Sequence, residues 1–138
     1  MYISESALVD ELIELLSQPS SPWGEMRHGR EFNFQRGRTD VVALSVDGDI
    51  LAFEAKLSRW RDALHQAYRN LCFANLSYVV LPREVAIYAT KHDEEFSNRG
   101  VGLCYIDHTR LVVLREATKN KPLQPWLSER ATLYVSGA

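Results

Sequence analysis

The sequence is poor in cysteine, has no long hydrophobic run and carries no excess of positive charge. Only 2 of its 138 residues are cysteines, and Cys72 and Cys104 lack the spacing of a metal site, so we expect reduced core thiols of a cytoplasmic protein. The apolar stretches fall far short of the roughly 20 residues that a membrane helix needs. The N-terminus has no basic segment of the kind that begins a signal peptide. A formal net charge of -2 argues against a protein that coats nucleic acid generally.

Several familiar catalytic patterns are also absent from the sequence. It contains no glycine-rich phosphate loop and no serine-histidine-aspartate arrangement. Its 4 histidines show no metal-ligand pairing: His92 lies in an acidic run that we expect to be solvated, and His65 is expected to face solvent. The apolar and charged fractions are close to globular averages, so a length of 138 residues predicts one domain with a real core.

Hydrophobic periodicity and turn residues predict the order helix, strands, helix, strand, helix, strands. The expected helices span residues 4–16, 58–75 and 83–100, and the clearest strands span residues 40–46, 50–57, 77–82, 101–107 and 110–117. Residues 23–39 are expected to form a strand or an irregular excursion, and Pro122 and Pro125 indicate an extended tail. This order predicts an α/β fold in which helices flank both faces of a mixed central sheet.

Three charged residues are expected to meet at the end of one hairpin. Glu54 and Lys56 are two apart on a predicted strand and therefore point to the same face. With a three-residue loop made of Asp47, Gly48 and Asp49, Asp40 would fall opposite Lys56 and join them. A two-residue Asp-Gly loop would turn Asp40 to the other face, because a shift of one residue reverses every side chain.

The first predicted helix offers a fourth charge. Its apolar positions centre near the direction of Glu5, which places an acid on the buried face. A buried carboxylate without a partner is costly, so the position indicates a site. The alternative is that Glu5 only stabilises the N-terminus of the helix.

The sequence Phe-Glu-Ala-Lys at residues 53–56, preceded by Asp40 and followed by a helix with Gln66, resembles the PD-(D/E)xK phosphodiesterases. These are the restriction-endonuclease-like nucleases, which include archaeal Holliday-junction resolvases. The resemblance implies a restriction-endonuclease-like core with a mixed central β-sheet flanked by helices.

The resemblance covers about residues 4–115, so we expect a nuclease-like domain over residues 1–116. Residues 117–138 would be a C-terminal extension that packs on the domain or at an interface. Thr39 stands where the motif has proline, a substitution that is common in the superfamily and does not imply inactivation.

Carried over by position, the resemblance implies a metal site. Asp40 and Glu54 would bind Mg²⁺ (or Mn²⁺) directly, with the backbone carbonyl of Ala55 as a third ligand. Glu5 would bind a second metal or the water shell of the first.

The same resemblance implies roles for two residues that do not bind the metal. Lys56 would orient or deprotonate the attacking water and offset charge on the phosphate, and Gln66 would hydrogen-bond near the site from the following helix.

Basic residues on both flanks of the motif would then contact phosphates of DNA. The candidates are Arg30, Arg36, Arg38, Arg59, Arg61 and Arg69. A solvated loop and a solvated helix face are the alternative reading of these charges. Five aromatic residues could stack on bases, although the last two are expected in the core: Trp23, Phe32, Phe34, Trp60 and Tyr68.

Three hypotheses follow from the sequence. The first is a metal-dependent nuclease that hydrolyses phosphodiester bonds of DNA, acting as a homodimer as the superfamily suggests. The second is a catalytically inactive nuclease-fold module that binds nucleic acid or a protein partner. The third is a domain in which Glu54 and Lys56 form only a structural ion pair.

Overall fold

A mixed sheet forms the centre of the protein, whose computed structural model describes residues 2–35, 37–107 and 109–137. In this described part the sheet has six strands, which follow one another across it in chain order: β1 (Arg27–Phe34), β2 (Gly37–Leu44), β3 (Ile50–Ala55), β4 (Leu76–Leu81), β5 (Gly102–Asp107) and β6 (Arg110–Arg115). Strands β1, β2 and β3 are antiparallel, β3, β4 and β5 are parallel, and β6 is antiparallel to β5.

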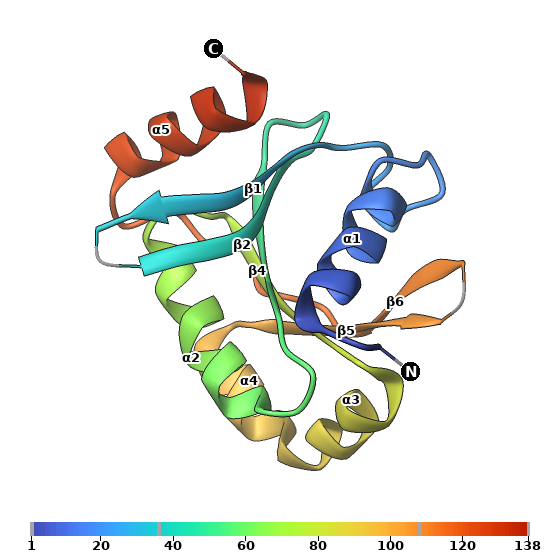
Figure 1. Ribbon diagram of the computed structural model, residues 1–138. Helices are drawn as coiled ribbons and strands as arrows, with labels where there is room; N and C mark the ends of the chain where they lie inside the picture. Colours follow the sequence, from blue (N-terminus) through green and yellow to red (C-terminus); the bar gives the residue numbers. More distant parts are fainter. Residues whose placement is uncertain (1, 36, 108, 138) are drawn as a thin grey trace.

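Helices cover both faces of this sheet (Figure 1). They are α1 (Glu5–Leu16), α2 (Trp60–Arg69), α3 (Arg83–Ala89), α4 (Asp93–Arg99) and α5 (Pro125–Ser136), with the short turns η1 (Asn70–Cys72) and η2 (Thr90–His92). Helix α1 packs on one face together with Phe53, whereas α2, α4 and α5 pack on the other. The predicted α/β class, with a mixed central sheet flanked by helices, is confirmed.

Helix α1 begins where its sequence predicts. The hydroxyl of Ser4 accepts a hydrogen bond from the Ala7 N–H at 3.0 Å, which satisfies one of the free donors at the helix start. The apolar side of the helix, with Leu8, Leu12 and Leu16, is fully buried against the sheet. Burial of each such side chain contributes on the order of 2 kcal/mol, so the helix is held chiefly by this face.

The hairpin between β2 and β3 has a three-residue loop, but its position differs from the expected one. Leu44 pairs with Ile50, and Ser45 donates its N–H to the Asp49 carbonyl. Continuing this register sets Asp40 opposite Glu54, not opposite Lys56 as the sequence analysis predicted. The number of loop residues is still odd, so the faces on which the side chains lie are as predicted.

The single helix predicted over residues 83–100 is wrong, because the chain forms α3, η2 and α4 there instead. At the break, the hydroxyl of Thr90 donates a hydrogen bond to the Ile87 carbonyl at 2.5 Å and so competes with the helical pattern. Ala86, Ala89 and Phe96 are nevertheless buried together in one cluster. The apolar spacing therefore indicated the buried face correctly while hiding the interruption.

The extended tail predicted after residue 117 is also wrong in part, because residues 125–136 form α5. Pro125 occupies the start of the helix, where a residue without an N–H costs nothing and its fixed φ favours the helical turn. Leu127, Ala131 and Val135 are buried against β1, β2 and β3.

Two further expectations concern cysteine and the membrane. Cys72 and Cys104 are free thiols, and Cys104 is fully buried, which raises its pKa well above the ordinary value. Among the helices of the described residues, none has the length and apolar character needed to cross a bilayer.

Candidate active site

Glu54 is a carboxylic acid buried inside the fold. It lies on β3, on the same face as Ala52, and only 1 % of its surface is exposed. Burial, followed by the neighbouring charge of Asp40, raises the pKa of Glu54 from its ordinary 4.5 to about 8. At neutral pH, without a cation nearby, Glu54 therefore holds its proton.

Asp40 lies beside Glu54 on the neighbouring strand. Its Oδ2 atom accepts a hydrogen bond from the Ala55 N–H at 2.9 Å, which holds the carboxyl group against the end of β3. After burial, the interaction with Asp40 is the next cause of the raised pKa of Glu54. The two carboxyl groups that the sequence singled out are thus adjacent in space.

Lys56 and Glu5 meet at the mouth of the same site. The Nζ atom of Lys56 is 3.9 Å from Oε1 of Glu5, and the N–H of Leu57 donates to Oε2 of Glu5 at 3.3 Å. Glu5 thus sits in the first turn of α1, as its role in stabilising the helix requires, and also faces the lysine. The expectation that Glu5 lies on the buried face is wrong, because 46% of its side chain is exposed at the mouth of the site.

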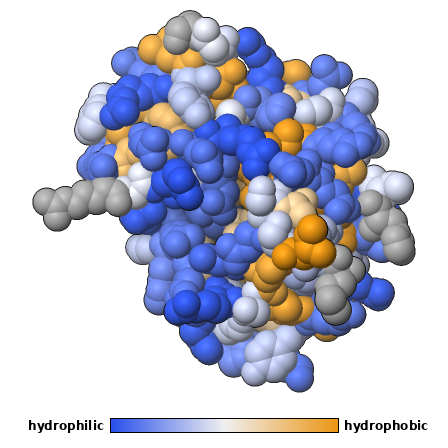
Figure 2. Space-filling model, in the orientation of Figure 1, coloured by the Kyte–Doolittle hydropathy of each residue, from blue (hydrophilic) through white to orange (hydrophobic). Residues whose placement is uncertain are grey.

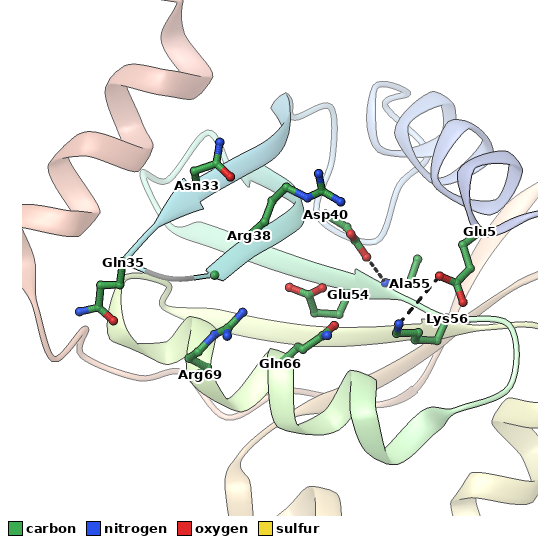
Figure 3. A pocket seen from close by; sticks show the side chains of 11 residues that line it. Glu5, Asn33, Gln35, Arg38, Asp40, Glu54, Ala55, Lys56, Gln66 and Arg69 are labelled. Atoms are coloured by element: carbon green, nitrogen blue, oxygen red, sulfur yellow. Dashed lines mark hydrogen bonds and ion pairs between the residues drawn. The ribbon is translucent and has the colours of Figure 1, made fainter.

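A cavity of about 730 Å³ joins these groups (Figure 3). All the residues to which the sequence analysis assigned metal or catalytic roles line it: Glu5, Asp40, Glu54, Ala55, Lys56 and Gln66. They come from α1, β2, β3, the segment after β3, and α2. Figure 2 shows hydrophilic residues across the middle of the face seen in Figure 1.

Two residues that hold Glu54 escaped the sequence analysis as site residues. The hydroxyl of Thr39 donates to Oδ1 of Asn70 at 2.8 Å, and Nδ2 of Asn70 donates to Oε2 of Glu54 at 2.7 Å. Both are fully buried, so these hydrogen bonds are not exchanged for water. An asparagine inside a predicted apolar helix face was the available signal, since buried amides are rare unless they bind a partner.

Comparisons with known proteins identify the fold. No family model and no curated protein matches the chain. A protein of unknown function from Silicibacter pomeroyi is similar in structure, with a TM-score of 0.72 and 18% sequence identity over 99% of this chain and 87% of that one. A repair endonuclease from Pyrococcus abyssi matches more loosely, with a TM-score of 0.46 and 17% identity over 86% of this chain and 49% of that one. The first of these likenesses shows the fold alone.

The predicted DNA-contacting arginines lie in different surroundings. Arg38 and Arg69 line the cavity, whereas Arg36 lies outside the described residues. Arg30 lines a smaller neighbouring hollow, where its Nη1 atom is 2.6 Å from Oδ1 of Asp10. The remaining two form ion pairs outside the cavity: Arg59 with Asp62 of α2, and Arg61 with Glu95 of α4.

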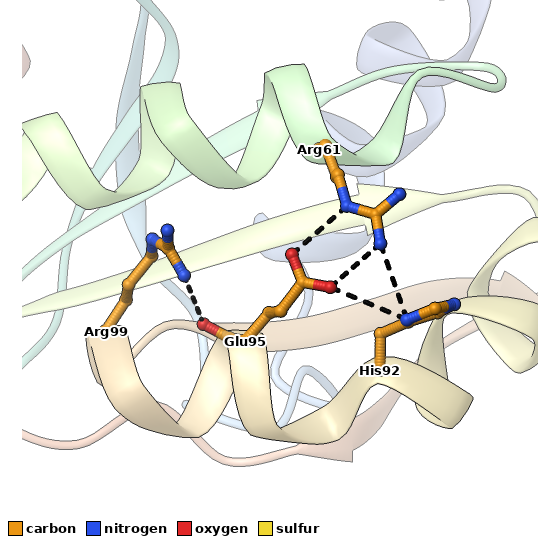
Figure 4. A network of polar contacts seen from close by, with 4 residues as sticks. All are labelled: Arg61, His92, Glu95 and Arg99. Carbon is orange, nitrogen blue, oxygen red and sulfur yellow. Dashed lines mark hydrogen bonds and ion pairs between the residues drawn. The ribbon is translucent and has the colours of Figure 1, made fainter.

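Arg61 in particular holds α2 against α4 (Figure 4). Its Nε and Nη2 atoms donate to the two oxygens of Glu95 at 3.1 and 2.9 Å, and Arg99 donates to the Glu95 carbonyl. The hydrogen bond from Arg61 lowers the pKa of Glu95. His92 is 3.5 Å from the same carboxylate, so Arg61 is part of an interhelical network and does not line the cavity.

The aromatic candidates for base stacking are mostly inside the protein. Phe32 and Phe34 are buried beneath α5, and Trp23 packs against Phe53 on the α1 face. Trp60 is a core residue as expected, but the expectation that Tyr68 is also in the core is wrong, since 52 % of it is exposed. Tyr68 lies on the exposed side of α2, next to the buried Ala67, so the apolar spacing of the helix was correct and Tyr68 is not part of it.

The donors in the cavity fit a hydrated divalent cation. The described residues contain no group of three or more histidine, cysteine, aspartate or glutamate side chains placed to hold a metal. Mg²⁺, however, is commonly bound by one or two carboxylates and keeps several waters. Asp40, Glu54 and the backbone of Ala55 provide such a set, and a cation would offset the burial and the charge of Asp40 that together raise the pKa of Glu54.

Proposed function

We propose that the protein is a metal-dependent nuclease that hydrolyses phosphodiester bonds of DNA. The observation that carries this proposal is the pair of adjacent carboxyl groups, Asp40 and buried Glu54, in one cavity with Lys56. A buried carboxyl group beside a second carboxyl group is costly to ionise, and a bound cation offsets that cost.

Asp40, Glu54 and the Ala55 carbonyl would hold Mg²⁺ (or Mn²⁺), which supplies an acidified water and neutralises charge on the phosphate. The ammonium group of Lys56 donates a hydrogen bond to the attacking water and offsets phosphate charge, while Glu5 fixes its direction from α1. The water oxygen attacks phosphorus and its proton passes to solvent, while the bond from phosphorus to the leaving sugar oxygen breaks and that oxygen takes up a proton from solvent.

Two further residues support the reaction. Gln66 presents an amide to the cavity from α2 and can hydrogen-bond the water or a phosphate oxygen. Asn70 orients the Glu54 carboxyl group, because its own amide is fixed by Thr39.

The test is cleavage of labelled DNA with Mg²⁺, Mn²⁺ or EDTA. We expect cleavage with either metal and none in EDTA, and losses of about a hundredfold or more for Glu54→Gln and Lys56→Ala. Lys121→Ala, at an exposed lysine that does not line the cavity, is the matched control and should keep full activity. Cleavage that persists in EDTA or in both site variants contradicts the proposal.

DNA binding that is sensitive to salt, with no cleavage under any metal, would instead identify a nuclease-fold binding module. We also propose, from the superfamily resemblance, that the protein acts as a homodimer with one cavity for each strand. Light scattering of the purified protein tests this expectation directly, since a monomeric mass contradicts it.

A further inference from the structure

Arg69 is the last residue of α2, and its side chain lies along the start of β2. The guanidinium carbon is 5.4 Å from the centre of the Phe34 ring, a distance at which a cation is attracted to the ring face. The exposed Arg69 side chain thus rests on the Phe34 ring and on the backbone of Gly37, and we call these two residues its seat.

Gly37 makes this seat possible. A Cβ atom built on Gly37 would lie 2.4 Å from both the Cζ and the Nη2 atoms of Arg69, closer than any real contact. Gly37 has no positive φ, so its backbone does not require glycine. The lack of a side chain at residue 37 is therefore explained by the close approach of the guanidinium group.

Arg69 also differs from the other predicted DNA-contacting arginines. Each of the other described ones has a carboxylate partner within 4.0 Å: Arg30, Arg38, Arg59 and Arg61. In the described part of the chain, Arg69 has no carboxylate within that distance, and it lines the cavity while its guanidinium carbon lies near the Phe34 ring. A planar guanidinium group with free paired donors matches the geometry of a phosphate.

The position of Arg69 extends the catalytic cavity in one direction. Figure 3 shows Arg69 and Lys56 on opposite sides of Glu54. A second hollow of about 340 Å³, lined by Phe34, Gln35, Gly37 and Arg69, adjoins the cavity on the side of Arg69. A strand that passes over the carboxyl groups would thus reach Arg69 next.

We propose that Arg69, seated on Gly37 and Phe34, binds a backbone phosphate of the DNA strand beside the phosphate that is cleaved. This proposal rests on the proposed nuclease function for its substrate. Arg69 then positions the strand, and Gly37 acts only by letting Arg69 lie where it does.

The test is the salt dependence of DNA binding, measured in EDTA by fluorescence anisotropy with a short labelled duplex and with its single strand. For Arg69→Gln we expect about tenfold weaker binding, and a slope of log affinity against log salt that is smaller by about 0.9 for the duplex or about 0.7 for the single strand. Arg69→Lys should keep the slope and lose a few-fold in affinity, because it keeps the charge but not the paired donors. Arg110→Gln, on the opposite edge strand, is the matched control and should change neither quantity.

A double-mutant cycle isolates the role of Gly37. Gly37→Ala should weaken binding several-fold in the wild-type background and have no further effect together with Arg69→Gln. Thermal melts of each variant establish that it is folded. An unchanged salt slope in Arg69→Gln, an equal effect of Gly37→Ala in both backgrounds, or no binding of either probe overturns the proposal.

The failure of this proposal is distinguishable from that of the nuclease function. Cleavage with Mg²⁺ and an unchanged slope in Arg69→Gln reject the phosphate contact and leave the nuclease function intact. Binding that depends on Arg69 without cleavage under either metal rejects the nuclease function and supports the phosphate contact.

Discussion

The buried acid at the centre of the site should make the protein less stable as pH rises. The pKa of Glu54 is raised to about 8 in the folded protein, whereas in the unfolded chain it returns to its ordinary 4.5. Between these values the folded protein keeps a proton that the unfolded chain has lost. The contribution of protonated Glu54 to the free energy of unfolding is therefore fully present below about pH 4.5 and is progressively lost as the pH rises to about 8.

The size of this effect follows from the difference between the two pKa values. One pKa unit corresponds to about 1.4 kcal/mol, so a difference of 3.5 units, from 4.5 to about 8, is on the order of 5 kcal/mol above pH 8. Glu54→Gln removes this loss, since a glutamine resembles the protonated acid and cannot ionise. Its amide oxygen can accept from Asn70 and its NH₂ group can donate to Asp40.

The free energy of unfolding, measured by urea titration in EDTA at several pH values, tests this prediction. We expect Glu54→Gln and the wild type to be similar near about pH 5, and the variant to be more stable by several kcal/mol near about pH 9. Glu14→Gln, at an exposed glutamate of α1, is the control and should show no such dependence. A stability difference that stays constant over this range, or a variant that is less stable at high pH, refutes the reasoning about Glu54.

Three further predictions test the surroundings of the site. Thr39→Val removes the donor to the buried oxygen of Asn70 and should cost about 1–3 kcal/mol of unfolding free energy in urea titrations, and a cost near zero contradicts the buried hydrogen bond. Mg²⁺ should raise the melting temperature of the wild type, measured by calorimetry, and not that of Asp40→Asn, whereas equal shifts would place the cation elsewhere. Gly102→Ala would put a Cβ atom 2.3 Å from the Tyr78 ring and 2.8 Å from the backbone of residue 117, so a loss of about 1–3 kcal/mol is expected in thermal melts, and an unchanged protein would show that this contact relaxes freely.

Much of the arrangement could be predicted because it depends on neighbours in the sequence. The spacing of Glu54 and Lys56 on one strand and the Asp-Gly loop before it relate residues that are close along the chain. An odd loop was sufficient to put Asp40 on the correct face, although its partner on β3 is two residues away from the predicted one. The exact register depends on Ser45, whose backbone and hydroxyl close the loop with Asp49.

The helical errors have a similar physical origin. Neither Pro125 nor Thr90 shows by its residue type alone whether a helix begins, continues or ends there. A proline ends a helix when it lies inside one and begins a helix when it lies at its first position, and only the apolar spacing after it separates the two cases. A threonine hydroxyl can bond the carbonyl three residues earlier inside a helix as well as at its end, so Thr90 did not by itself indicate the break.

The residues that complete the site could not be found from local pattern, because their roles exist only across the fold. Asn70 is 31 residues from Thr39 and 16 from Glu54. Both of its hydrogen bonds require that η1, which contains Asn70, packs against the paired strands β2 and β3. Gly37 gains its meaning only when Arg69 is brought against it from the end of α2. A charged residue at a position predicted to be buried indicates a site, because burying a charge is costly. An amide or a glycine can be assigned to a site only from the contacts that it makes. For this reason the carboxyl groups were predictable from the sequence, and the residues that hold and flank them become evident only from the packing of α2 against the sheet.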